Sequence, residues 1–67
     1  MSIAKVTEIT ATSTKGFEDA ITTGIARACK TLKNVKGAWV NGQKVDIKNG
    51  KIISYRVDLK VTFVLED

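Results

Sequence analysis

The sequence predicts an α+β fold with the element order β-α-β-β, in which a three-stranded, antiparallel-type sheet of strand order 1-3-2 wraps one helix. Three observations lead to this expectation: a long alternation of apolar and polar residues in the last third of the chain, one segment with helical periodicity, and one strong hairpin turn. The third strand takes the central place because the helix that links the first two strands crosses over the sheet. We expect a single domain that spans residues 1–67.

The first strand is predicted at residues 3–10, which are rich in isoleucine, valine and threonine. Apolar side chains fall on both of its faces, since Ile3 and Ile9 lie on one face and Val6 lies on the other. Residues 11–16 are small and polar, which predicts a loop that leads into the helix.

The helix is the second periodic segment, in which apolar and small residues recur every three or four positions: Phe17, Ala20, Ile21, Gly24, Ile25, Ala28, Cys29 and Leu32. Gly16 is the expected N-cap, and acidic residues in the first turn and basic residues near the end suit the helix dipole. Gly24 costs about 1 kcal/mol relative to alanine inside a helix, which predicts a close approach of the helix to a strand or a neighbouring subunit. Cys29 is expected to be a small core residue rather than a nucleophile.

A second strand is predicted at residues 35–47. The Asn49-Gly50 pair that follows is the best hairpin turn of the chain, because both residues tolerate the positive φ of a type I′ turn. Asn41-Gly42 is interpreted as a bulge or kink within one long strand rather than as a second hairpin.

The third strand carries the strongest signal. Between residues 53 and 65 every odd position is apolar: Ile53, Tyr55, Val57, Leu59, Val61, Phe63 and Leu65. A strand of this length spans roughly 40 Å at about 3.3 Å per residue, which is more than one small domain comfortably covers. Chains this short are marginally stable without disulfides, metals or oligomerisation, so we expect this chain to assemble with copies of itself.

Composition narrows the functions open to the chain. One cysteine cannot form an internal disulfide, and the absence of histidine removes the usual zinc ligand and the usual general base. Neither a metal site nor catalysis is therefore expected, and no Gly-rich phosphate-loop motif occurs. We expect a cytoplasmic protein with a reduced thiol and no membrane partner.

The net charge of +4 is concentrated after the helix, where basic residues from Lys33 to Lys60 outnumber acidic ones. This surplus favours an anionic ligand, either a phosphate ester or nucleic acid. The alternative is a solvated strand face whose lysines prevent edge aggregation. Trp39 lies in the same region, and its indole either stacks on a planar ligand or fills a subunit interface, which is the preferred interpretation.

Several segments of the chain share the pattern of a known family: Thr12-Ser13, Phe17-Glu18-Asp19-Ala20-Ile21, Arg27-Ala28, Thr31-Leu32-Lys33-Asn34-Val35, Gly50-Lys51 and Tyr55-Arg56-Val57-Asp58-Leu59-Lys60-Val61-Thr62-Phe63. With these segments the chain resembles the dodecins from about residue 3 to residue 66. The resemblance implies a hollow homododecamer of β-α-β-β protomers. It also implies a flavin-binding protein that stores riboflavin or FMN in stacked pairs at subunit interfaces, and not an enzyme.

The resemblance also marks candidate binding residues. In flavin-binding dodecins a tryptophan two positions after the family's valine stacks on the flavin ring, and a glutamine after the tyrosine hydrogen-bonds the ring's polar edge. The valine is Val35 here, so the stacking position falls on Gly37 and the glutamine position on Arg56; a position that is polar in some members falls on Gly42. Trp39 lies on the same strand face as Gly37, and we treat it as a displaced stacking surface. The candidate flavin-binding residues are thus Val35, Gly37, Trp39 and Arg56.

Other functions stay open on the sequence alone. A dodecin without the flavin tryptophan could hold an ion or a small anion in its cage, with Arg56 on a phosphate or carboxylate. A basic oligomer could bind nucleic acid through the Lys-rich hairpin, although the sequence has no recognition-helix pattern and no paired surface aromatics. A purely structural role is the remaining alternative.

Overall fold

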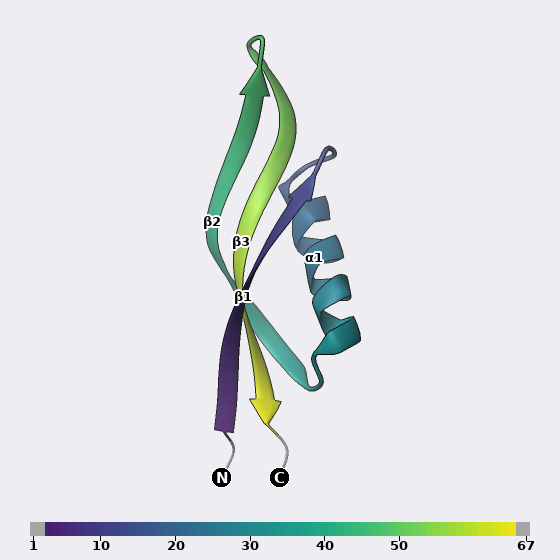
Figure 1. Ribbon diagram of the computed structural model, residues 1–67, viewed down its shortest axis with the longest axis vertical. Coiled ribbons are helices and arrows are strands. Elements are labelled where there is room, and N and C mark those ends of the chain that lie inside the picture. The colour runs from purple at the N-terminus through teal and green to yellow at the C-terminus, as the bar shows by residue number, and fades with distance from the viewer. Residues whose placement is uncertain (1–2, 66–67) are drawn as a thin grey trace.

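The computed structural model describes residues 3–65, which form four elements in chain order: β1 (Ile3–Ser13), α1 (Phe17–Thr31), β2 (Val35–Lys48) and β3 (Lys51–Leu65). Within these residues the sheet has three strands in the order β1-β3-β2, and the central strand β3 pairs antiparallel with both neighbours. Helix α1 lies along one face of this sheet (Figure 1). The predicted fold class, element order and strand order are confirmed.

Strand β1 is longer than predicted. Residues 11–13 were expected in a loop, but Ala11, Thr12 and Ser13 continue the strand and pair with residues 57, 56 and 55 of β3. Small polar residues have only a weak intrinsic preference for strand or loop, so the hydrogen bonds to the long central strand β3 decide their conformation. The loop to the helix is consequently short.

Helix α1 begins after Gly16, the predicted N-cap, and ends where Leu32 turns to extended backbone. The N–H of Ala20 donates to the carbonyl oxygen of Gly16 at 3.1 Å. A Cβ atom at Gly24 would lie 2.9 Å from the Cβ of Ala11. This confirms the predicted close approach, which is between α1 and β1.

The core lies between α1 and the middle of β3. Ala20, Val57, Leu59 and Val61 are completely buried, and half-buried apolar residues of β1, α1 and β2 surround them. Cys29 corrects the sequence analysis: its side chain is exposed, not part of the core. The buried stripe of the helix is narrow and consists of Ala20, Gly24 and Ala28. These small residues let the helix lie close to the sheet, and only the side chains directly between the two are buried.

The hairpin between β2 and β3 turns at Asn49-Gly50, with φ of 53° and 74°. These positive φ values confirm the predicted type I′ turn. The predicted bulge at Asn41-Gly42 is also present, since Val40 pairs with Leu59 and Gly42 with Asp58. Two further register shifts, at residues 35/37 and 46/47, were not predicted.

The β2-β3 hairpin projects past the helix and past the end of β1 (Figure 1), and the protomer measures 52 × 19 × 13 Å. Several large apolar side chains are exposed over the sheet and at its ends: Ile3, Val6, Trp39, Val40, Ile47, Ile52, Ile53 and Leu65. One helix cannot cover a sheet of this length. Among residues 3–65 no helix is long and apolar enough to cross a membrane.

Candidate functional site

The candidate residues lie on the strands β2 and β3, and the strand register assigns each of them to a face. Residues opposite the buried side chains of β3 face the helix, and the alternate residues form the outer face of the sheet. Gly37, Trp39 and Arg56 all lie on this outer face, because Gly37 pairs with Thr62 and Trp39 with Lys60. The prediction that Gly37 and Trp39 share a face is confirmed.

Trp39 stands over a shallow hollow on the outer face. The hollow measures about 350 Å³ and is lined by Lys36, Gly37, Ala38, Trp39 and Thr62. The indole of Trp39 is 76% exposed, so its ring is available to a ligand or to another protein. Within the part of the chain that the structure describes, a Cβ atom at Gly37 would meet no heavy atom within 4 Å, so the space at the family's stacking position is open.

Val35 has a different environment from the other candidates. It pairs with Phe63 at the start of β2 and is half-buried against the core. Its contacts are with the packed side of the sheet, so in this protomer Val35 supports the strand that carries Gly37 and Trp39.

Arg56 lies farther along β3. It lies four positions before Lys60, the partner of Trp39, which corresponds to about 13 Å along a strand. Its Nη2 atom forms an ion pair with Asp46 Oδ2 at 3.3 Å, and the Ser54 hydroxyl donates to the same oxygen at 2.6 Å. Trp39 and Arg56 therefore do not form one site within a protomer.

The carboxyl group of Asp46 has a pKa below its ordinary value of 3.8. The hydrogen bond from the Ser54 hydroxyl is the main cause, and the positive charges of Arg56 and Lys44 add to it. The sequence analysis missed Asp46 as the partner of both Arg56 and Ser54, because an unpredicted bulge sets the register that brings them together.

Gly42 lies on the outer face at a position separate from those of Trp39 and Arg56. It pairs with Asp58, whose Oδ1 accepts a hydrogen bond from the Thr10 hydroxyl at 3.0 Å. Asp46 and Asp58 lie at different positions along the sheet, because Asp46 pairs with Ser54 and Asp58 pairs with Gly42. Within residues 3–65 no three His, Cys, Asp or Glu side chains gather in a group that could hold a metal ion.

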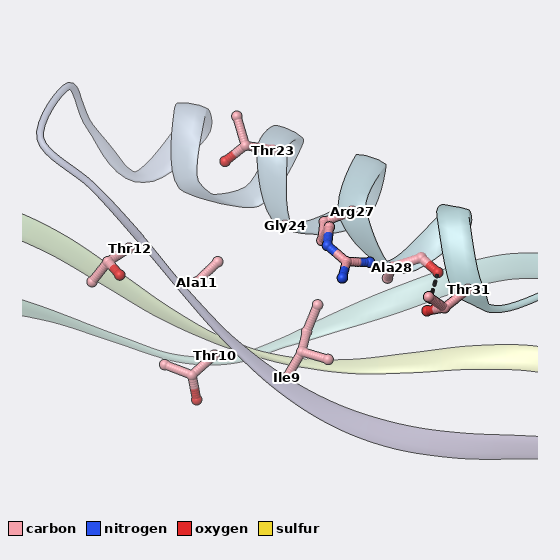
Figure 2. Close-up of a pocket in the computed structure, with 9 residues that line it drawn as sticks. All are labelled: Ile9, Thr10, Ala11, Thr12, Thr23, Gly24, Arg27, Ala28 and Thr31. Atoms are coloured by element: carbon pink, nitrogen blue, oxygen red, sulfur yellow. Dashed lines mark hydrogen bonds between the residues drawn. The ribbon is translucent and has the colours of Figure 1, made fainter.

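A larger hollow of about 470 Å³ lies between α1 and the free edge of β1 (Figure 2). Ile9 and Ala11 point toward the helix, whereas Thr10 and Thr12 point away from it. Arg27 contributes its guanidinium to this hollow. The hollow contains none of the candidate binding residues of the sequence analysis, and its lining includes apolar side chains of β1 and the small residues Gly24 and Ala28 of the helix.

The comparisons with known proteins agree with this geometry. The sequence model of the Dodecin family matches residues 3–66. The chain belongs to the dodecin family. The structure of the dodecin from Streptomyces davaonensis is 35% identical in sequence, with a TM-score of 0.93, and the match covers 98% of this chain and 97% of that one. A substituted form of the dodecin of Thermus thermophilus is 34% identical, with a TM-score of 0.94 and full coverage of both chains.

Another dodecin structure with a similar fold is described as a calcium-chelating antigen, the calcium dodecin of Mycobacterium tuberculosis. It is 32% identical to this dodecin, with a TM-score of 0.83, and the match covers 97% of this chain and 93% of that one. The comparison with curated protein sequences found no match.

Proposed function

We propose that this dodecin is a small-ligand-binding protein that assembles as a hollow homododecamer and stores a flavin, riboflavin or FMN, without catalysing a reaction. One domain of residues 1–67 is the repeating unit of this assembly. The single observation that carries the ligand assignment is the exposed ring of Trp39 beside the open space at Gly37. Membership in the dodecin family supports both parts of the proposal.

The exposed apolar surface supports the assembly. At the projecting hairpin, Ile47, Ile52 and Ile53 are 50–64% exposed. Each Å² of apolar surface removed from water stabilises an assembly by about 25 cal/mol. Among the described residues, strands β1 and β2 each pair only with β3, so the outer edges of both are open to another copy. Self-association covers the apolar ends and the edges at the same time.

The aromatic surface supports the flavin. A ring stacked on a tryptophan contributes on the order of 1–3 kcal/mol, and Trp39 is the only tryptophan in the sequence. It lies two positions beyond Gly37 on the same face, so the stacking surface is displaced along β2 rather than lost. Arg56 has hydrogen-bond donors for the carbonyl oxygens of a flavin. Because Arg56 lies about 13 Å along the strand from Trp39, it reaches only a flavin ring that is held by another copy of the chain.

A titration with FMN tests the flavin assignment. We expect micromolar FMN to lose fluorescence as it stacks on Trp39, and the tryptophan emission to fall with it. Trp39→Ala should raise the dissociation constant by about tenfold to a hundredfold, which is the equivalent of the stacking energy. Trp39→Phe is the matched control, since it keeps a smaller ring. No quenching of the wild-type complex, or equal binding by Trp39→Ala, contradicts the assignment.

An ion or a small anion is the second candidate ligand, and the calcium dodecin of Mycobacterium tuberculosis is the observation that favours it. Calcium needs six to eight oxygen ligands, so its site would have to join carboxylates such as Asp46 and Asp58 from several copies. Calorimetric titration of the assembled protein with calcium distinguishes the two candidates. Saturable calcium binding together with an absence of FMN binding would select the second.

A further inference from the structure

We propose that the hollow between α1 and the free edge of β1 binds a small monocarboxylate with an elongated apolar body, such as a medium-chain fatty acid. The hollow measures about 470 Å³, and ligand pockets measure about 300–1,000 Å³. It lies on the helix side of the sheet and contains none of the candidate flavin residues. The inference therefore goes beyond the proposed flavin function and does not rest on it.

The small residues of α1 determine the shape of the hollow. Gly24 and Ala28 lie one turn apart on the buried side of the helix, and both line the hollow. Ile9 and Ala11 point toward the helix from β1 (Figure 2) and form the apolar lining on the strand side. Along the helix the lining runs from residue 23 to residue 31, which corresponds to about 12 Å of helix axis. A groove of this length suits an extended chain better than a single ring.

Arg27 provides the charge of the hollow. Among the described residues it is the one charged residue in the lining, and within residues 3–65 its guanidinium has no hydrogen-bond or ion-pair partner. The side chains that lie one turn away from it on α1 are those of Thr23, Gly24, Lys30 and Thr31. The helix therefore offers no carboxylate within one turn, and Lys30 adds a second positive charge beside the hollow.

Strand β1 adds no acidic group to the hollow. Thr10 and Thr12 point away from the helix (Figure 2), so they line the hollow with the backbone of the free strand edge. Glu8 lies two residues before Thr10 and so shares its outer face, where it is opposite Lys60. The positive charge on the helix side of the sheet is thus left without an acidic partner.

The two threonine hydroxyls of the helix do not compete with Arg27 for an anion. Thr23 donates to the carbonyl oxygen of Asp19 at 2.8 Å, and Thr31 donates to that of Ala28 at 3.4 Å. Their hydroxyl protons are used within α1, and toward a ligand their oxygens act as acceptors. The guanidinium is therefore the strongest donor that the hollow offers to a negatively charged group.

A carboxylate at one end of an apolar chain matches both features of the hollow. The planar guanidinium of arginine binds a carboxylate through two parallel hydrogen bonds. Each CH₂ group that leaves water for the apolar lining strengthens binding by up to about fourfold. A ligand with its carboxylate at Arg27 and its chain along Gly24 and Ala28 uses the charge and the apolar lining at the same time.

The experiment titrates the purified protein with octanoate and with its uncharged counterpart octanol, and follows the δ1-methyl signals of the isoleucines by NMR. Ile9 lines the hollow, whereas Ile47, Ile52 and Ile53 lie at the projecting hairpin and are internal controls. We expect the Ile9 signal to shift and to saturate with octanoate, while the hairpin signals stay in place. Octanol should bind about tenfold more weakly, because it lacks the charge-assisted contact with Arg27.

Three variants assign the binding to the hollow. Arg27→Gln should remove the preference for octanoate and leave octanol binding within about twofold. Lys30→Gln is the matched control, since it removes the same charge from an exposed position that does not line the hollow, and it should keep the preference. Thr23→Phe should weaken both ligands, because a large side chain at this exposed lining position fills the hollow.

Several results would overturn the proposal. An unshifted Ile9 signal at millimolar octanoate would show that the hollow does not bind this ligand, as when another copy of the chain covers it. Equal affinities for octanoate and octanol, or equal weakening by Arg27→Gln and Lys30→Gln, would remove the role of Arg27. Shifts confined to the hairpin isoleucines would place the binding elsewhere. None of these results depends on FMN, so the flavin proposal stands or fails separately.

Discussion

Replacing Gly24 with alanine tests how closely α1 is seated on β1. The new Cβ atom would lie 2.9 Å from the Cβ of Ala11, whereas carbon atoms pack best at about 3.5–4.0 Å. The helix must move away by roughly 0.6 Å or more. Overpacking of this kind costs about 1–3 kcal/mol, and the better helix propensity of alanine returns about 1 kcal/mol. We expect a net loss of about 1 kcal/mol in the free energy of unfolding.

Removing the opposing methyl group should reverse the sign. In an Ala11→Gly background the nearest atoms to the alanine Cβ introduced at position 24 are Leu59 Cδ1 at 3.5 Å and Ile9 Cδ1 at 3.9 Å, which are ordinary contacts. Gly24→Ala then stabilises the protein by up to about 1 kcal/mol through helix propensity. The difference between the two backgrounds, a coupling energy of about 2 kcal/mol, measures the close approach itself.

The assay is guanidinium unfolding followed by far-UV circular dichroism for the wild type, both single variants and the double variant. All four are compared at one protein concentration, because the proposed assembly would add to the apparent stability. Tryptophan fluorescence is a poor probe here, since Trp39 is already exposed in the folded protomer. Equal stabilisation by Gly24→Ala in both backgrounds would refute the close packing of α1 on β1.

Two further predictions concern the core and the outer face. Leu59→Ala should lower the free energy of unfolding by about 3–5 kcal/mol, because Leu59 is completely buried and truncation leaves a cavity; a loss below about 1 kcal/mol in chemical denaturation would contradict the assigned core. Ser54→Ala should raise the pKa of Asp46 toward 3.8, as seen by NMR titration of its carboxyl carbon, because the hydrogen bond that chiefly lowers it is removed. Since the folded-state pKa is lowered, the stabilisation linked to Asp46 is present above pH 3.8 and is lost as the pH falls through the folded-state pKa. An unchanged pKa in the Ser54→Ala variant would show that the charges of Arg56 and Lys44 dominate instead.

Local signals in the sequence were sufficient for most of the fold. The Asn49-Gly50 turn, the alternation in β3 and the small residues of α1 each depend on a rule that acts over a few residues, and all three appear as predicted. The predicted end of β1 was wrong, because Ala11 to Ser13 take their conformation from a partner strand far away in the sequence. The prediction that Cys29 is a core residue was wrong, because α1 contacts the sheet through a narrower stripe than the apolar residues of the helix suggest.

The candidate site was predicted less completely than the fold. The shared face of Gly37 and Trp39 follows from the two-residue period of a strand and is confirmed. The Arg56 to Asp46 ion pair depends on the register between strands, and a shift of one residue changes which side chains meet. Counting back from the turn at Asn49 would place Asp46 opposite Ile53, but the bulge places it opposite Ser54. Bulges without a distinctive residue pattern could not be foreseen.

The most direct test of the central claim, that Trp39 is the displaced binding surface of this dodecin, is a crystal structure of the assembled protein grown with FMN. We expect the flavin ring to lie flat against the indole of Trp39. A structure in which a neighbouring copy covers Trp39 while FMN is absent or bound at another surface would contradict the claim.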